Sequence, residues 1–272
     1  MSTGRQRIIE IDYCEVMYGR RTVLDVENLA IDAGERVAIV GSSGSGKTTL
    51  LRAIKGYVPP SAGKVEVLGA NWASVSRRVR RRTAKRIGLV FQQFHLVGRL
   101  TVFQNVLCGR LGRTRRLASL FGRFSSHDRR VAWQAICEVG LADCVHQRAD
   151  TLSGGQQQRV GMARVIAQQP DVILADEPVS SLDPALADDV LRLLVSVHRH
   201  HGTTLLMVLH QPELARRYSE RIIGLRDGRI VFDGPPTALT AEVEEEIYRG
   251  REPVRFDSRA ASHAASSTAA TA

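Results

Sequence analysis

Short apolar runs recur along the chain, separated by segments whose apolar residues follow a helical spacing. Four of these runs are long enough for a buried parallel strand and too short for an isolated helix: 35–40, 87–91, 172–175 and 204–209. The helical patterns that lie between them cover 49–55, 155–168 and 186–200. This alternation predicts an α/β fold built on a parallel sheet.

Other apolar runs carry a different signal and flank that sheet. Residues 8–18 read as an antiparallel strand. Residues 222–225 and 230–232 read as a second antiparallel pair, because the Asp-Gly at 227–228 between them favours a hairpin turn. These segments predict an antiparallel β subdomain beside the parallel core.

Strand signals fade between residues 93 and 147, where helical patterns such as 128–139 dominate. This change predicts a helical subdomain inserted into the sheet domain, at roughly 94–168. We expect one domain over 6–250. We also expect a disordered tail over 251–272, because a segment made mostly of Ala, Ser and Thr buries too little surface to offset its ordering entropy.

The composition adds an unusual positive charge to this picture. The chain has 272 residues, of which 43% are apolar, and a formal net charge of +10 that comes mainly from arginine. Basic residues cluster at 77–86 and at 110–116. Such clusters can bind nucleic acid or the anionic inner face of a membrane, but a solvated helix face also accounts for them. Charge alone therefore does not decide the function.

Several kinds of protein are disfavoured by the composition. No stretch approaches the roughly 20 uncharged apolar residues of a membrane-spanning helix, and residues 1–11 lack the apolar core of a secretory signal. The cysteines are scattered and show no CxxC spacing, so we expect neither a disulfide framework nor a zinc site. We expect them to be small buried side chains in a reducing cytoplasm: Cys14, Cys108, Cys137 and Cys144.

The segment GSSGSGKT at 41–48 has the clearest chemistry, and it lies between the strand 35–40 and the helix 49–55. Glycines let the backbone approach a phosphate closely, and successive N–H groups at a helix N-terminus surround its oxygens. Lys47 would add a positive charge on the β- and γ-phosphates, and the Thr48 hydroxyl would ligate Mg²⁺. Strand, glycine loop and helix in this order predict a nucleotide site.

The apolar strand 172–175 ends in two carboxylates, Asp176 and Glu177. At the carboxyl end of a parallel strand they would emerge beside the phosphate loop, where α/β sheets bind ligands. Asp176 would hold Mg²⁺, directly or through water. Glu177 would polarise the attacking water, as a general base or as an orienting group.

The LSGGQ segment at 152–156 is the discriminating motif. Ser153 is predicted to be the N-cap of a helix whose apolar face includes Val160, Ala163 and Ala167. A capped helix with two glycines in its first turn is a second anion site. One nucleotide cannot easily use two helix N-termini so far apart, but two copies arranged head to tail can place each Ser153 helix on the γ-phosphate of the other copy.

The order of GSSGSGKT, LSGGQ and ILADEP, followed by His210, resembles the ATPase subunits of ABC transporters over about residues 8–250. The resemblance implies a P-loop NTPase (RecA-like) parallel sheet core and a homodimer of ATPase subunits that binds ATP and Mg²⁺. It implies two membrane-spanning permease subunits as partners and no nucleic acid. It also implies a peripheral location on the cytoplasmic face of the inner membrane.

The family further implies roles at single matching positions. Tyr18 resembles the aromatic residue that stacks on adenine, with a simple core tyrosine as the alternative. Gln92, with its neighbour Gln93 as the alternative, resembles the glutamine that links Mg²⁺ and water to the membrane partner. Asp183 ends a segment that looks like the loop crossing the dimer interface, and His210 resembles the γ-phosphate sensor.

The motifs and the resemblance together define the expected site. The expected nucleotide-binding residues are Tyr18, Gly41, Ser42, Ser43, Gly44, Ser45, Gly46, Lys47, Thr48, Thr49, Ser153, Gly154, Gly155, Gln156 and Asp183. The expected catalytic residues are Glu177, His210 and Gln92, and the expected Mg²⁺ ligands are Thr48, Gln92 and Asp176. The implied mechanism is electrostatic: fixed charges and dipoles neutralise the departing γ-phosphoryl group while Glu177 orients water.

Some segments resemble one subgroup of the family, the phosphonate-import ATPases; they are 100–112, 121–124, 209–211 and 221–236. This resemblance implies an importer for phosphonates, served by a periplasmic substrate-binding protein. An importer for phosphite or another small oxyanion is the near alternative. The alternative of a different class is a soluble ABC ATPase acting on nucleic acid, but such proteins usually carry two ATPase units or a long coiled coil, and this chain has one phosphate loop and no sustained heptads.

Overall fold

The computed structural model describes residues 6–91, 95–114, 124–180 and 182–249. Gln92, Gln93 and the expected disordered tail at 251–272 lie outside these ranges, so the predictions made for them stay predictions. The same holds for residues 121–123 of one subgroup-like segment. The expected domain limits, 6–250 with a helical part at 94–168, also stay predictions.

The chain alternates strands and helices along most of its length. The strands are β1 (Arg7–Tyr18), β2 (Arg21–Asp32), β3 (Arg36–Val40), β4 (Ala62–Val67), β5 (Ala70–Asn71), β6 (Ile87–Phe91), β7 (Val172–Asp176), β8 (Thr204–Val208), β9 (Arg221–Arg226) and β10 (Arg229–Gly234). The α-helices are α1 (Lys47–Lys55), α2 (Arg77–Ala84), α3 (Val102–Leu107), α5 (Ser126–Glu138), α6 (Gly154–Gln168), α7 (Pro184–His201), α8 (Pro212–Tyr218) and α9 (Ala241–Tyr248). Short 3₁₀ helices are η1 (Cys108–Arg110), η2 (Ala142–Cys144), η3 (Ala149–Thr151) and η4 (Pro236–Ala238).

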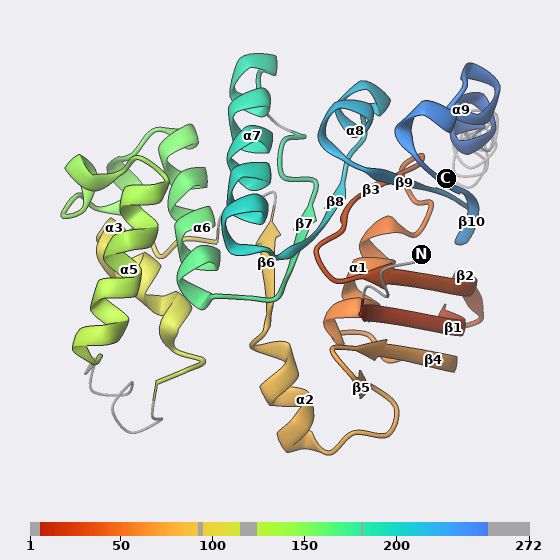
Figure 1. Cartoon of the computed structure of the whole chain (residues 1–272), viewed down its shortest axis with the longest axis horizontal. Coiled ribbons are helices and arrows are strands. Elements are labelled where there is room, and N and C mark those ends of the chain that lie inside the picture. Colours follow the sequence, from red (N-terminus) through yellow and green to blue (C-terminus); the bar gives the residue numbers. More distant parts are fainter. Residues whose placement is uncertain (1–5, 92–94, 115–123, 181, 250–272) are drawn as a thin grey trace, which may run out of the picture.

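The molecule is built on two sheets, a larger one that passes through its centre and a smaller one at the right-hand side of Figure 1. The larger has six strands in the order β10-β9-β3-β8-β7-β6, and every neighbouring pair is parallel except β10 with β9. The smaller is antiparallel, in the order β2-β1-β4-β5. The predicted fold class is therefore confirmed: a parallel P-loop-type core, an antiparallel β part and a group of helices.

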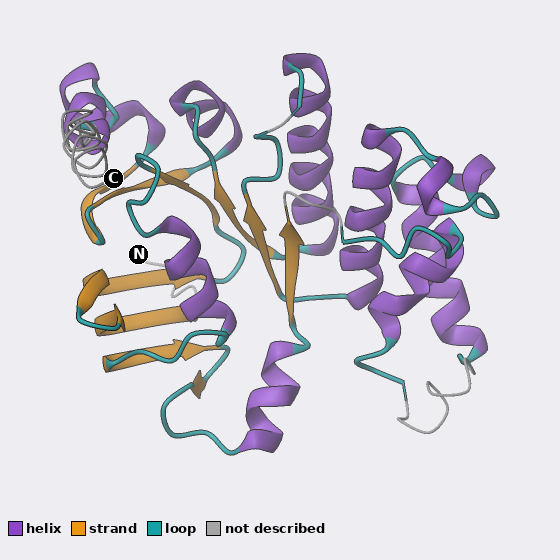
Figure 2. Ribbon diagram, turned by 180° about the vertical axis from the view of Figure 1, so that it is seen from behind, coloured by secondary structure: helices purple, strands orange, loops and turns teal. Residues whose placement is uncertain are grey.

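The parallel sheet is covered on both faces, which explains the continuous apolar runs of its strands. In β3, Val37 and Ile39 point into a core shared with α1 and the antiparallel sheet. Ala38 and Val40 point the other way, into a core built with α5, α6, α7 and α8. Figure 2 shows the helices on either side of the sheet.

The prediction for the last hairpin was incomplete. β9 and β10 pair antiparallel around Asp227-Gly228 as expected, but β9 also pairs in parallel with β3, where Val40 lies opposite Gly224. The hairpin therefore extends the nucleotide-binding sheet. Spacing within a hairpin cannot reveal this, because a third strand far away in sequence decides it.

Several elements were missed by the sequence analysis. In β2 the buried positions alternate as Leu24 and Val26, and then change phase to Leu29 and Ile31, so no uniform period of two exists. β4, β5 and α9 were also missed. The arginine run at 77–82 forms α2, in which only Thr83 is buried, in agreement with a solvated helix face. Among the described residues, no helix has the length and apolar character needed to cross a membrane.

Two other expectations were wrong in part. The cysteines are free, but only Cys14 is buried, and burial raises the pKa of its thiol to about 11; Cys137 is exposed. Arg110, counted with the basic run 110–116, is 3% exposed and its Nε lies 2.8 Å from Oδ1 of Asp128. It is a structural residue that joins η1 to α5.

Candidate functional site

The phosphate loop leaves β3 under tight steric constraint. Gly41 has φ 149°, and a Cβ atom there would lie 2.2 Å from the carbonyl oxygen of Leu225 on β9. Gly46 has φ 105°, and a Cβ atom there would lie 2.9 Å from the carbonyl oxygen of Val23 on β2. Both positions therefore require glycine, because the backbone of the loop passes directly over two strands.

The β9–β10 turn supports the loop from outside, which the sequence did not predict. The backbone N–H of Gly228 donates to the carbonyl of Ser45 (2.9 Å), and the carbonyl of Gly228 accepts from the N–H of Asp25 (2.8 Å). Gly228 thus connects the loop to β2. The Asp-Gly signal marked the turn, but nothing local indicated its contact with the phosphate loop.

The start of α1 has the properties of an anion site. No side chain among the described residues caps this helix, so its first N–H groups are available to a ligand. Lys47, 4% exposed, donates from Nζ to the carbonyls of Gly41 (2.9 Å) and Ser42 (2.8 Å). Burial lowers the pKa of Lys47, while the charges of Glu177 and Asp176 counteract this. The buried Ser45 hydroxyl has no hydrogen-bond partner among the described residues. These groups fit a phosphate.

Asp176 meets the first turn of the same helix. The Thr48 hydroxyl donates to Oδ1 of Asp176 at 3.1 Å. Burial raises the pKa of Asp176, the Thr48 hydrogen bond opposes this, and the nearby charge of Glu177 adds to the rise. One hydroxyl and one carboxylate beside a phosphate cradle are oxygen ligands that suit Mg²⁺, which usually takes only one or two carboxylates from the protein.

Glu177 and His210 form a pair. Oε1 of Glu177 lies 2.7 Å from Nε2 of His210, and Glu177 adopts a φ of 51°, which is unusual for a residue with a side chain. Both side chains are partly exposed. Glu177 leaves β7 and His210 follows β8, and these strands are neighbours, so their carboxyl ends bring the two side chains together. The sequence pointed to each residue separately and not to their contact.

The LSGGQ helix forms as predicted, but it lies away from the phosphate loop of its own chain. Ser153 caps α6 and accepts from the N–H of Gln156 (3.3 Å), while Oε1 of Gln156 accepts from the N–H of Ser153 (3.0 Å). Val160, Ala163 and Ala167 are buried as expected. In Figures 1 and 2, strands β6–β8 separate α6 from α1. Ser153 and Gly154 are exposed.

Two further predicted residues lie outside this cluster. Asp183 is the N-cap of α7, where its carboxylate accepts from the N–H of Leu186 (3.0 Å). Tyr18 ends β1 and is 49% exposed; it belongs to the same hairpin as Val23, whose carbonyl meets the phosphate loop. This exposure argues against the core-tyrosine alternative.

Sequence reasoning also missed Gln158, which is 2% exposed on α6. Its Nε2 donates to the carbonyl of Pro178, directly after Glu177. The LSGGQ helix is thus tied to the loop that carries the second carboxylate. A single buried glutamine on a helix gives no sequence signal for such a contact.

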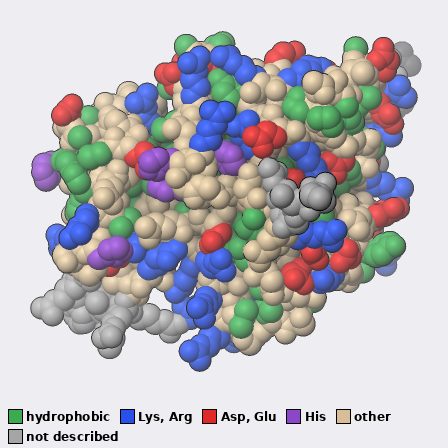
Figure 3. Space-filling model, viewed as in Figure 1, with side chains coloured by type: hydrophobic (Ala, Val, Ile, Leu, Met, Phe, Trp, Pro, Cys, Tyr) green, Lys and Arg blue, Asp and Glu red, His purple; other side chains and the backbone are tan. Residues whose placement is uncertain are grey.

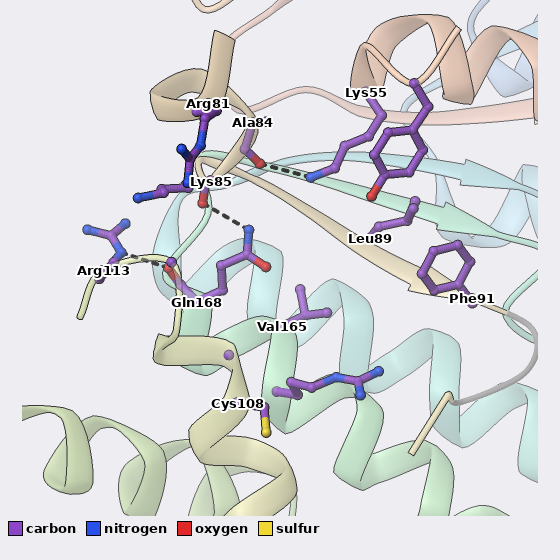
Figure 4. Close-up of a pocket in the computed structure, with 14 residues that line it drawn as sticks. Lys55, Arg81, Ala84, Lys85, Leu89, Phe91, Cys108, Arg113, Val165 and Gln168 are labelled. Carbon is purple, nitrogen blue, oxygen red and sulfur yellow. Dashed lines mark hydrogen bonds between the residues drawn. The ribbon is translucent and has the colours of Figure 1, made fainter. Parts of the chain in front are cut away.

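A separate groove of about 500 Å³ lies between the sheet and the helical part, beside β6 (Figure 4). Phe91, at one end of its lining, directly precedes Gln92 in the chain. No acidic residue lines it within the described ranges. The basic residues that line it are Lys55, Arg81, Lys85, Arg113 and Arg164. Figure 3 shows Lys and Arg side chains gathered over the neighbouring helix α2 at the lower edge of the molecule.

Comparison with known families agrees with this geometry. The family model described as "ABC transporter" matches residues 24–180. The chain is 45% identical, over 93% of its length and 94% of the relative, to "Phosphonates import ATP-binding protein PhnC 1" of Pseudomonas aeruginosa strain UCBPP-PA14. It is 43% identical to "Phosphonates import ATP-binding protein PhnC 3" of Halalkalibacterium halodurans, over 89% of this chain and 94% of that one.

Solved structures give the same result for the fold. The chain resembles cbiO1 from Clostridium perfringens, part of the transporter complex cbiONQ, with a TM-score of 0.77 and 26% identity over 88% of this chain and 92% of that one. It also resembles the dimeric structure of MJ0796, a bacterial ABC transporter cassette, with a TM-score of 0.73 and 32% identity over 84% and 99% of the two chains.

Proposed function

This chain belongs to the ABC transporter family, and from that premise we propose that it is the ATP-hydrolysing subunit of an importer for phosphonates. The observation that carries the proposal is the 45% identity, over nearly the full length of both chains, to a relative named for phosphonate import. The complete phosphate loop and the Glu177–His210 pair support ATP hydrolysis by this chain itself. The assignment of phosphonate as the substrate is taken from the relatives alone, because an ATPase subunit does not itself contact the transported molecule.

Residues of one chain would hold most of one nucleotide. The α1 N-terminus and Lys47 would bind the β- and γ-phosphates, and Tyr18 would stack on the adenine. Thr48 and Asp176, already in contact at 3.1 Å, would hold Mg²⁺ together with Gln92, and the ion would add positive charge beside the phosphates.

Glu177 and His210 would act on the reacting atoms. Glu177 would accept a hydrogen bond from the attacking water and orient it toward the γ-phosphorus. His210 would donate a hydrogen bond to the γ-phosphate. Their 2.7 Å contact supports roles at the same phosphate, because it brings the carboxylate and the imidazole together at the ends of the neighbouring strands β7 and β8.

The second half of each site would come from another copy of the chain. The exposed N-terminus of α6, with Ser153, Gly154, Gly155 and Gln156, offers N–H groups that its own phosphate loop cannot use across β6–β8. A head-to-tail homodimer would place this helix on the partner's γ-phosphate, with Asp183 near the interface. ATP would favour that closed dimer, and hydrolysis would release it.

The permease subunits would dock at the basic groove beside β6. Its lining carries positive charge from α1, α2 and α6, and it ends next to the proposed Mg²⁺-linked residue Gln92. A cytoplasmic segment of a permease bound there would be displaced when the sheet and the helices move relative to each other. The protein would then sit peripherally on the cytoplasmic face of the inner membrane, with a periplasmic binding protein delivering the substrate.

The test is ATP hydrolysis in proteoliposomes that contain this chain, its permease and its binding protein. Binding protein loaded with a phosphonate should stimulate hydrolysis, and free phosphonate added to the isolated chain should not. Phosphite, phosphate and a polar amino acid are the comparison ligands. Stimulation by phosphite alone would move the protein to an oxyanion importer, and stimulation by the amino acid alone would end the phosphonate proposal.

A further inference from the structure

We propose that Tyr248 is a positioning residue for ATP hydrolysis, holding the backbone of His210 from the last turn of α9. The inference rests on the proposed role of His210 at the γ-phosphate. Neither the sequence analysis nor the family resemblance assigned any part to α9. In this role α9, the last helix of the described residues, supports the hydrolytic site.

The contact chain is short and continuous. The hydroxyl of Tyr248 donates to the backbone carbonyl of His210 at 3.0 Å, and Nε2 of the same histidine lies 2.7 Å from Glu177. Directly before His210, the N–H of Leu209 donates to the carbonyl of Ile39 on β3 (3.0 Å). The backbone of His210 is therefore held between the sheet on one side and α9 on the other.

The helix α9 is itself firmly placed. Ile247 is fully buried against β9 at Gly224, where a Cβ atom would lie 2.6 Å from the Ile247 side chain. Hydrogen bonds from two arginines flank this apolar contact: Arg216 of α8 donates to the Glu244 carboxylate (2.5 Å), and Arg226 donates to the backbone carbonyl of Glu246 (2.9 Å). A helix held at three points can transmit a fixed position to the residue at its end.

The same hydroxyl also lies at the start of the phosphate loop. Burial raises the pKa of Tyr248 to about 12, the charge of Glu244 adds to this, and a hydrogen bond with the Gly41 backbone opposes it. The hydroxyl is therefore protonated, and able to donate, throughout the pH range of ATPase assays. Gly41 follows Val40, which pairs with Gly224 under α9, so one helix contacts both loops that would handle phosphate.

A purely structural role for Tyr248 is separable from a positioning role. Its ring packs against the core that covers the parallel sheet, and a phenylalanine would keep that packing. Only the hydroxyl reaches His210. Tyr218 provides a control, because its hydroxyl also donates a hydrogen bond, but to the side chain of Asp188 on α7 and not to His210 or the phosphate loop.

The experiment compares Tyr248→Phe with Tyr218→Phe. In the assembled transporter, Tyr248→Phe should lower kcat about 3- to 10-fold, the value of one neutral hydrogen bond expressed as a rate, with KM for MgATP changed less than about twofold. Tyr218→Phe should leave kcat within about twofold of the wild type. Thermal unfolding of the purified chains should show both variants folded, with a shift in Tyr248→Phe no larger than that in Tyr218→Phe, because only Tyr218 donates to a charged group.

A binding cycle tests whether Tyr248 acts through His210. On the purified full chain, the measured quantity is the preference for the Mg²⁺ complex of AMP-PNP, which carries a γ-phosphoryl group, over that of ADP. Tyr248→Phe should reduce this preference and His210→Ala should reduce it further, while the double variant should match His210→Ala alone.

Three results would overturn the inference. The first is a wild-type kcat and nucleotide preference in Tyr248→Phe while His210→Ala is impaired, which leaves the proposed function standing. The second is a double variant whose nucleotide preference falls by the product of the two single effects, because the two residues would then act independently. The third is wild-type behaviour of His210→Ala, which would also overturn the proposed site.

Discussion

Arg110 is the residue on which the helical part of the fold should depend most. Its guanidinium lies at the meeting point of η1, α5 and α6, where it contacts Asp128 (2.8 Å) and donates to the carbonyl of Ala167 (2.9 Å) and to Oε1 of Gln169 (2.9 Å). Replacing it with methionine keeps much of the apolar volume but removes every donor. We expect this change to destabilise the protein strongly.

The magnitude follows from what the substitution leaves behind. The Asp128 side chain is 9% exposed, so its carboxylate would stay buried without its cation, and removing one partner of a buried ion pair typically costs about 3–5 kcal/mol. Gln169 is exposed, so its side chain can form a hydrogen bond with water instead, and losing its hydrogen bond with Arg110 adds little to the cost. The buried, unpaired carboxylate of Asp128 therefore accounts for most of the loss in the free energy of unfolding.

The cost should also depend on pH. Burial by itself would raise the pKa of Asp128, but hydrogen bonds from Ser125 and Arg110 and the charge of Arg110 outweigh it and lower the pKa. In the wild type this carboxylate stabilises the fold above its unfolded pKa, and the contribution is lost as the pH falls through the lower folded value. Without Arg110 two of the contributions that lower this pKa are gone, so the pKa should be higher than in the wild type, and the destabilisation should shrink as acid protonates Asp128.

The assay is urea unfolding, with amide hydrogen exchange in α5 and α6 to localise the effect. Arg113→Met is the matched control: Arg113 also donates to the end of α6, but its hydrogen bonds are exposed, and its loss should cost less than about 1 kcal/mol. Arg110→Met with Asp128→Asn should recover at least half of the loss, because no buried charge remains. Equal costs for Arg110→Met and Arg113→Met, or no recovery in the double variant, would refute the reasoning.

Two further predictions concern the chemistry. Glu177→Gln should bind ATP but lose steady-state hydrolysis and accumulate an ATP-bound dimer on size exclusion, because an amide cannot accept the water's proton; near wild-type turnover would reject the assignment. Ser153→Arg should block hydrolysis with monomer ATP affinity retained, and mixing it with Lys47→Ala should restore activity, since each mixed dimer has one intact composite site. A loss of monomer affinity in Ser153→Arg would place Ser153 in its own chain's site.

The sequence by itself determined the features that depend on neighbouring residues. The strand, glycine loop and helix around Lys47 were predictable because periodicity and close-approach glycines act within a few residues. The Ser153–Gln156 capping box and the carboxylates at the end of β7 are local in the same sense. Family resemblance then assigned roles that no local pattern contains.

The tertiary structure alone decided where distant segments meet. In the sequence Arg110 is one more basic residue in a run, yet the structure buries it. The sequence does not reveal this, because the partners of Arg110 lie 18 or more positions away. The contact between Glu177 and His210 depends on the order of β7 and β8, and the contact between Tyr248 and His210 spans 38 positions and depends on Ile247 docking at Gly224. Such contacts follow from the packing of whole elements, which buries apolar area with little regard to sequence distance, so no local pattern of residues records them.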